Sequence, residues 1–278
     1  MKRLLCLCLP LVLAGCDQGT VQLDVADAPV DDADRIVVQF TGVVLYRDDG
    51  ETETFDFDAP KSIDLAAQVE GATANLLDGA GVDEGRFTSI RLKVSADGSG
   101  DDSFVDVDGT LTPLRLEDAD ASRLRVSHGF SVDRLDETRL VVDFDLRKSV
   151  HAPDGAAEPY DLRPSLRVVD PEDAGAVTGA VSAARAGAAG CRPAVYVYTG
   201  HGATPDDVGS ALPPYASAIV RLDTDYAYRV AWLPAGNYTV AFTCEAAADD
   251  PELDDDIALE DPQNVTVRAE ETETADFP

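Results

Sequence analysis

The chain reads Leu140-Val141-Val142-Asp143-Phe144-Asp145-Leu146-Arg147, with an apolar side chain at every even-numbered position. A period of two predicts a β-strand that turns one face to a core and the other to water. The same alternation recurs upstream, from Ile36 to Phe40 and from Ile90 to Val94. Because such strands are typical of antiparallel sheets, we expect residues 21–170 to form a β-domain. We also expect Arg147 and Lys148 to pair with Asp143 and Asp145 across strands.

The turns between these stretches support the same fold class. Asp108-Gly109 separates two short apolar stretches, and glycine tolerates the positive φ of a tight hairpin turn. Only residues 65–77 have a helix-like pattern, and Gly71 interrupts it. The fold class predicted from these patterns is all-β.

A second β-region follows an Ala- and Gly-rich joint, residues 171–190. Residues 176–181 of the joint already fit the first strand of this region. After Cys191 the alternation resumes, with Val195 and Val197 between tyrosines. We therefore expect two β-sandwich-like domains, the second over residues 174–278.

Four phrases of the first region carry a family resemblance. They are Asp24-Val25-Ala26-Asp27-Ala28-Pro29, Gly85-Arg86-Phe87-Thr88-Ser89-Ile90-Arg91-Leu92, Asp143-Phe144-Asp145-Leu146-Arg147-Lys148-Ser149 and Leu162-Arg163-Pro164-Ser165-Leu166-Arg167. In this order they resemble a family of bacterial lipoproteins, the domain of unknown function 4382 family, over about residues 19–170. The resemblance supports a lipoprotein and implies no activity, cofactor or catalytic residue.

The second region carries a different phrase, Trp232-Leu233-Pro234-Ala235-Gly236-Asn237-Tyr238-Thr239-Val240. It resembles the transthyretin-like modules that occur beside carboxypeptidases and in bacterial envelope proteins. The resemblance implies a β-sandwich over about residues 174–278. In such a module, residues 265–267 and 274–277 would form the closing hairpin.

The N-terminus has the order of features of a secretory signal peptide. Lys2 and Arg3 precede an apolar run of eleven residues, which is shorter than the roughly 20 needed to span a bilayer. The run ends at Gly15-Cys16, which resembles the lipobox of bacterial lipoproteins. We therefore expect residues 1–15 to be removed, Cys16 to be lipidated, and residues 16–20 to form a tether.

This anchor predicts the location of the protein. A lipidated Cys16 would hold the body on a membrane of the bacterial cell envelope, facing the periplasm. Asp17 follows the lipidated position, which resembles the signal for retention in the inner membrane. The inner membrane is therefore slightly favoured over the outer membrane, with the lipid as the membrane contact.

The formal net charge of −31 excludes one class of partner. Nucleic-acid binding needs basic patches for phosphates, so we expect none. The two acidic runs, residues 97–108 and 249–256, lack the ligand spacing of a calcium loop. We therefore predict no metal site and no cofactor, and we expect ordinary salt to relieve the repulsion within these runs.

Catalytic motifs are absent from the sequence. His128, His151 and His201 lie far apart, without metal-binding spacing, and no serine has a Gly-x-Ser-x-Gly elbow around it. We therefore expect no enzyme, but an envelope lipoprotein that acts as a binding or structural module for an unidentified envelope protein or glycan. The alternative is a calcium-dependent glycan-binding protein, or an envelope enzyme, that uses the acidic loops.

Two sets of residues in the second region are candidate sites. Cys191 shares strand parity with Val195 and Val197, and Cys244 shares parity with Phe242, so both thiols should face one apolar layer. In an oxidising envelope this arrangement predicts a Cys191–Cys244 disulfide. Exposed tyrosines could form a surface for a sugar or peptide, although alternating tyrosines are more often strand surface or core. The tyrosines in question are Tyr196, Tyr198, Tyr226 and Tyr228, with Tyr215 nearby.

Overall fold

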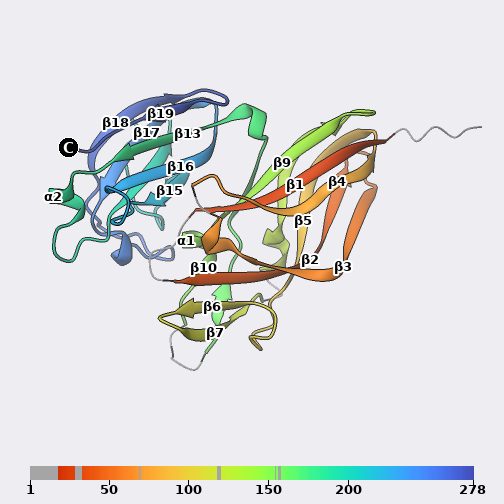
Figure 1. The fold of residues 1–278 in the computed structure, drawn as a ribbon, viewed down its shortest axis with the longest axis horizontal. Coiled ribbons are helices and arrows are strands. Elements are labelled where there is room, and N and C mark those ends of the chain that lie inside the picture. Colours follow the sequence, from red (N-terminus) through yellow and green to blue (C-terminus); the bar gives the residue numbers. More distant parts are fainter. Residues whose placement is uncertain (1–17, 29–32, 69, 118–119, 154, 156–157) are drawn as a thin grey trace, which may run out of the picture.

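The computed structural model describes residues 18–28, 33–68, 70–117, 120–153, 155 and 158–278. Strands dominate this part of the chain (Figure 1), and the α-helices described are two single turns, α1 (Leu146–Ser149) and α2 (Ala183–Ala186). The all-β fold class is therefore confirmed. The predicted signal peptide, residues 1–15, and Cys16 lie outside the described residues. None of the helices described has the length and apolarity needed to cross a bilayer.

The first sheet has four strands, and β1 (Gln18–Ala28) runs along β9 (Glu137–Asp145) in parallel. In this pair Leu23 lies opposite Leu140 and Val25 opposite Val142, so apolar side chains of distant segments meet. The outer neighbours of the pair are antiparallel. In spatial order the strands are β12 (Leu166–Val169), β9 (Glu137–Asp145), β1 (Gln18–Ala28) and β4 (Ala74–Asp83).

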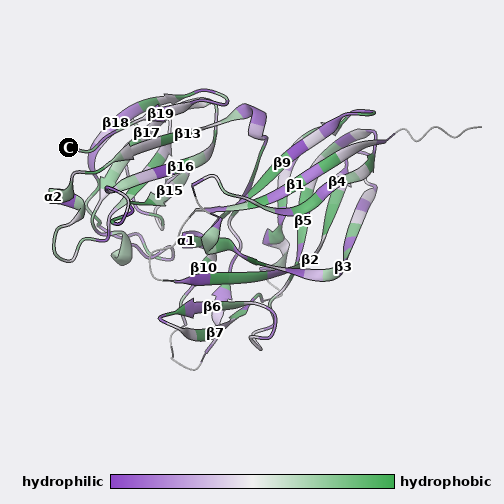
Figure 2. Ribbon diagram, in the orientation of Figure 1, coloured by the Kyte–Doolittle hydropathy of each residue, from purple (hydrophilic) through white to green (hydrophobic). Residues whose placement is uncertain are grey.

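The second sheet packs on the first around one large core. Ile36, Val38 and Phe40 of its central strand are fully buried, and hydrophobic residues alternate with hydrophilic ones along these strands (Figure 2). The sheet's order is β10 (Val150–His151), β11 (Tyr160–Leu162), β7 (Thr110–Arg115), β6 (Phe104–Val107), β2 (Arg35–Arg47), β5 (Gly85–Ser95) and β8 (Arg125–Val132), with β3 (Thr52–Asp64) also paired to β2.

The third and fourth sheets enclose a second core built on Val195, Val197, Val240 and Phe242. The third sheet is β16 (Ala227–Pro234), β13 (Ala174–Ala180) and β19 (Thr272–Thr274). The fourth sheet is β15 (Ala216–Ile219), β14 (Ala194–Thr199), β17 (Gly236–Thr243) and β18 (Glu260–Val267). Single 3-10 turns connect strands at η1 (Leu65–Ala67), η2 (Ala121–Leu124), η3 (Pro171–Asp173) and η4 (Ala246–Ala248).

Cys191 and Cys244 form a disulfide, as predicted, with their Cα atoms 4.5 Å apart. Cys191 lies just before β14 and Cys244 just after β17, and these strands are antiparallel neighbours with Val195 opposite Phe242. The predicted adjacency of the two segments is therefore confirmed.

Three local predictions are corrected. In the helix-like stretch 65–77, residues 65–67 form the 3-10 turn η1, and residues 74–77 belong to β4. The predicted closing hairpin is wrong because β18 belongs to the fourth sheet and β19 to the third, where β19 runs parallel to β13. The stretch from Leu140 does not continue as a strand to Arg147, because it turns into α1 at Leu146.

Candidate functional site

A cavity of about 310 Å³ lies between the β9–β12 edge and the segment that precedes β15. One wall carries charged side chains of the phrase Asp143–Ser149, namely Asp143, Asp145 and Lys148, together with Arg167 of β12. The other wall is the turn around Pro214 and Tyr215. In Figure 1, α1 and the end of β9 lie between the N-terminal sheets and the C-terminal sheets, so we call this region the junction.

Asp143 and Arg167 form the centre of the junction. They are register partners on β9 and β12, and Arg167 Nη2 lies 2.5 Å from Asp143 Oδ2. Asp143 is only 3% exposed, and this burial raises its pKa to about 6 even though the charge of Arg167 acts in the opposite direction. Arg167 also donates through Nη1 to the Tyr215 carbonyl oxygen at 2.8 Å, with its guanidinium 4.7 Å from the Tyr215 ring centroid.

Lys148 makes a second contact to the same turn. Its Nζ lies 3.0 Å from Asp145 Oδ2 and donates to the Pro214 carbonyl oxygen at 2.6 Å. The Asp145 side chain also caps α1 by accepting from the backbone N–H of Lys148. The predicted pairing of Lys148 with Asp145 is present, but within one turn and not across strands.

Arg147 reaches further, into the C-terminal part. Its Nη1 donates to the Ala246 carbonyl oxygen at 2.9 Å and contacts the Tyr196 hydroxyl at 3.2 Å. The Tyr196 hydroxyl in turn donates to the Asp249 carboxylate in a short hydrogen bond. Arg147 is 5% exposed, so this chain of polar contacts crosses the junction out of reach of solvent.

The predicted tyrosine surface is wrong for three of its four members. Tyr196, Tyr198 and Tyr228 are at most 3% exposed, and only Tyr226 is partly exposed. The second core covers one face of β14, and a smaller apolar cluster with Arg147 covers the other, so its tyrosines have no free face. Tyr215, by contrast, lines the cavity at the junction.

The remaining sequence candidates do not assemble into a catalytic group. His128, His151 and His201 lie on β8, on β10 and after β14. Burial lowers the pKa of the first two. In the acidic run 97–108, Asp106 pairs with Arg35 at 2.7 Å.

These observations define an all-β protein in which two pairs of packed sheets meet at a charged junction. The sequence matches the family described as Domain of unknown function (DUF4382) over residues 18–164, which is more than half of the chain. The chain therefore belongs to this family. No curated protein matches the sequence.

Three solved structures give weak similarities. The Bacillus anthracis TIE protein is 9% identical with a TM-score of 0.24, covering 93% of this chain and 34% of that one. The minor pilin GBS52 of Streptococcus agalactiae is 9% identical with a TM-score of 0.23, covering 92% of this chain and 94% of that one. The shaft pilin SpaA of Lactobacillus rhamnosus GG is 7% identical with a TM-score of 0.22, covering 94% and 98%.

These similarities do not carry an argument about function, because the TM-scores are below those of a shared fold over the whole chain. The chain also spans only about a third of the length of the TIE protein. It spans about a quarter of a leucine-rich repeat protein from Bacteroides thetaiotaomicron VPI-5482.

Proposed function

We propose that this chain is a non-enzymatic lipoprotein of the bacterial cell envelope that acts as a binding or structural module. The observation that carries the proposal is that the charged side chains at the junction bind the opposite wall of the cavity. Lys148 and Arg167 donate to backbone carbonyl oxygens of the opposite wall, at Pro214 and Tyr215. These two charges, from two of the phrases that resemble the family, therefore join the N-terminal sheets to the C-terminal sheets.

The same contacts argue against catalysis in this cavity. General acid–base catalysis needs a titratable group that can reach a substrate. Asp143 is buried against Arg167, and Asp145 is held by Lys148 and by the N-terminus of α1. With both acids committed to internal partners, the cavity offers a shaped surface with an aromatic ring and no free acid–base pair.

The position of β1 supports tethering through Cys16. The strand begins at Gln18, so residues 18–20 belong to β1 and not to the predicted tether 16–20. A lipid on Cys16 would therefore hold the body within about 7 Å of the bilayer. The start of β1 lies at the end of the N-terminal sheets that faces away from the C-terminal part (Figure 1). Tethering there would point the junction and the C-terminal part into the periplasm, away from the membrane.

We expect the Cys16→Ser variant to lose all incorporation of a labelled fatty acid, because the thiol is the attachment atom. Metabolic labelling with palmitate in the native host would measure this. Cys8→Ser is the matched control, since that cysteine lies in the part removed with the signal, and it should keep the label. Equal labelling of wild type and Cys16→Ser would refute the anchor.

A crosslinking comparison in intact membranes tests the binding module. We expect wild type to give a discrete crosslinked species that Tyr215→Ala reduces at least several-fold, because Tyr215 forms one wall of the cavity. Leu111→Ala, on a side chain that is 58% exposed elsewhere, should leave the species unchanged. In parallel, turnover of ester, glycoside or peptide substrates that disappears in Asp143→Asn would contradict a non-enzymatic role.

A further inference from the structure

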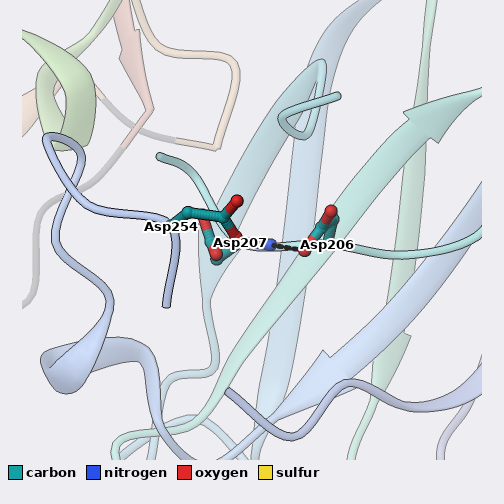
Figure 3. Close-up of side chains that lie close together, drawn as sticks. All are labelled: Asp206, Asp207 and Asp254. Carbon is teal, nitrogen blue, oxygen red and sulfur yellow. Dashed lines mark hydrogen bonds between the residues drawn. The ribbon is translucent and has the colours of Figure 1, made fainter. Parts of the chain in front are cut away.

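Three carboxylates from two separate loops meet at one point beside β14. Asp206 and Asp207 belong to the loop between β14 and β15, and Asp254 to the loop between β17 and β18. One carboxylate oxygen from each lies within 4.8 Å of those of the other two (Figure 3). Among the described residues this is the one group of three or more histidine, cysteine or acidic side chains close enough to share a metal ion.

The backbone brings the two loops into direct contact. The Val208 N–H donates to Asp249 Oδ1 at 3.1 Å. A Cβ on Gly209 would lie 1.7 Å from the Leu253 carbonyl oxygen, so only glycine permits this approach. The proximity of the three acids therefore follows from close backbone packing and not from the reach of flexible side chains.

Asp207 provides an independent sign that a ligand belongs here. The residue is 0% exposed, yet neither of its carboxylate oxygens has a hydrogen-bond partner within the described structure. Proteins pair a buried carboxylate with a cation or with several donors, because an isolated buried charge is very costly. None of the described lysine, arginine or histidine side chains forms an ion pair with Asp206, Asp207 or Asp254.

The local field also favours a cation. Three carboxylate oxygens lie within 4.8 Å of one another here. Like charges at this spacing oppose one another in a chain whose net charge is already −31. A bound cation would relieve both the repulsion and the cost of burying Asp207.

We propose that Asp206, Asp207 and Asp254 bind one calcium ion. The ligand atoms are all carboxylate oxygens, which suit hard cations and not zinc or copper. Calcium–oxygen distances of about 2.3–2.6 Å place ligands on opposite sides of the ion about 5 Å apart, so the three oxygens fit around one ion. Calcium takes six to eight oxygens, and water fills the positions that the three aspartates leave open.

The site has a consequence for the junction. The loop that carries Asp254 also carries Glu252, which pairs with Arg163 and lies 3.7 Å from His151 Nδ1 in the N-terminal part. Calcium that ties Asp254 to Asp207 therefore also fixes one of the segments through which the N-terminal and C-terminal sheets are in contact. The absence of a metal site was predicted from the ligand spacing within each acidic run. A site whose ligands come from two separate loops has no such spacing, so the sequence pattern does not reveal it.

Thermal melting of the full chain in detergent, after chelation of bound metal, tests the site. At about 100 times its dissociation constant, calcium should raise the midpoint by about 5 °C or more above sodium chloride at matched ionic strength. Asp254→Asn, on an exposed side chain, should lose most of this rise. Asp256→Asn, an exposed acid in the same run but outside the group, should keep it.

The melting temperature of Asp207→Asn provides a second test, because it should differ from wild type in opposite directions with and without calcium. Without calcium this variant should melt at or above the wild-type temperature, because the buried charge is gone. With calcium it should melt below wild type, because a ligand is gone. The proposal is overturned if calcium acts no better than sodium, if Asp254→Asn and Asp256→Asn respond alike, or if acidification alone stabilises the metal-free protein and calcium adds nothing.

Discussion

Replacing Cys191 and Cys244 together by alanine is expected to lower the free energy of unfolding by about 4 kcal/mol. The disulfide joins residues 53 positions apart, and the constraint it places on the unfolded chain grows with that separation. The native contacts around it should persist in the variant. The Arg192 N–H donates to the Cys244 carbonyl oxygen at 2.8 Å, and β14 stays paired to β17.

Urea unfolding of the two proteins would measure the difference. The double replacement is preferred because a single one would leave a free thiol in or beside the second core, where Cys191 is 7% exposed. Reductant provides the control: it should move wild type to the midpoint of the double variant and leave the variant unchanged. A loss below about 1 kcal/mol would contradict the expected role of the bridge.

The strand pattern and the turns could be predicted because they depend on neighbouring residues. Alternation identified the buried face of β2, on which Ile36, Val38 and Phe40 are fully buried. Asp108 and Gly109 both adopt positive φ between antiparallel β6 and β7, as a tight hairpin turn requires. The disulfide could be predicted because its two cysteines lie next to β14 and β17, and both pack on the second core as their parity with Val195 and Phe242 predicted.

The exposed faces of β9 and β14 were mispredicted for one physical reason. Alternation reports which side of a strand meets its own core, but not whether another part of the chain covers the second side. Asp143 is buried because Arg167 and the turn at Tyr215 lie against it, and Tyr196 is buried because Arg147 and η4 cover it. In neither case do the covering residues lie next to the buried strand in the sequence.

Only some residues of the candidate site could be predicted from the sequence, for a related reason. The phrase from Asp143 to Ser149 drew attention through its resemblance to a family, and it does line the junction. Its partners Pro214 and Tyr215 lie on another part of the chain and carry no motif. Asp206 and Asp207 form too short an acidic stretch to stand out, and only the fold brings them to Asp254.

Arg167→Met should destabilise the protein by about 3–5 kcal/mol at pH 8, because it leaves Asp143 buried without its partner. The variant also loses the hydrogen bond to the Tyr215 carbonyl oxygen, so the junction is weakened on both walls. Chemical denaturation would measure the loss. Arg139→Met removes a cation from an exposed pair with Glu137 and should cost little by comparison.

The loss should depend on pH in a definite direction. Burial already raises the pKa of Asp143 to about 6, and Arg167 is the cation that holds it down, so its removal raises this pKa further. A carboxyl group with a raised pKa in the folded state favours folding when protonated. The penalty of Arg167→Met should therefore be largest above the folded pKa and shrink as the pH falls from 8 toward 5.

Adding Asp143→Leu to Arg167→Met should recover most of the lost stability at pH 8. The second change removes the buried charge that the first leaves unpaired, and an apolar pair of similar volume is often as stable as a buried ion pair. The recovered stability should also lose the pH dependence between 5 and 8, because the titrating group is gone. If the double variant is as unstable as Arg167→Met at pH 8, the loss comes from the broken contact to Tyr215 and not from the unpaired Asp143. That result would assign the cohesion of the junction to the contacts of Arg167 with the opposite wall.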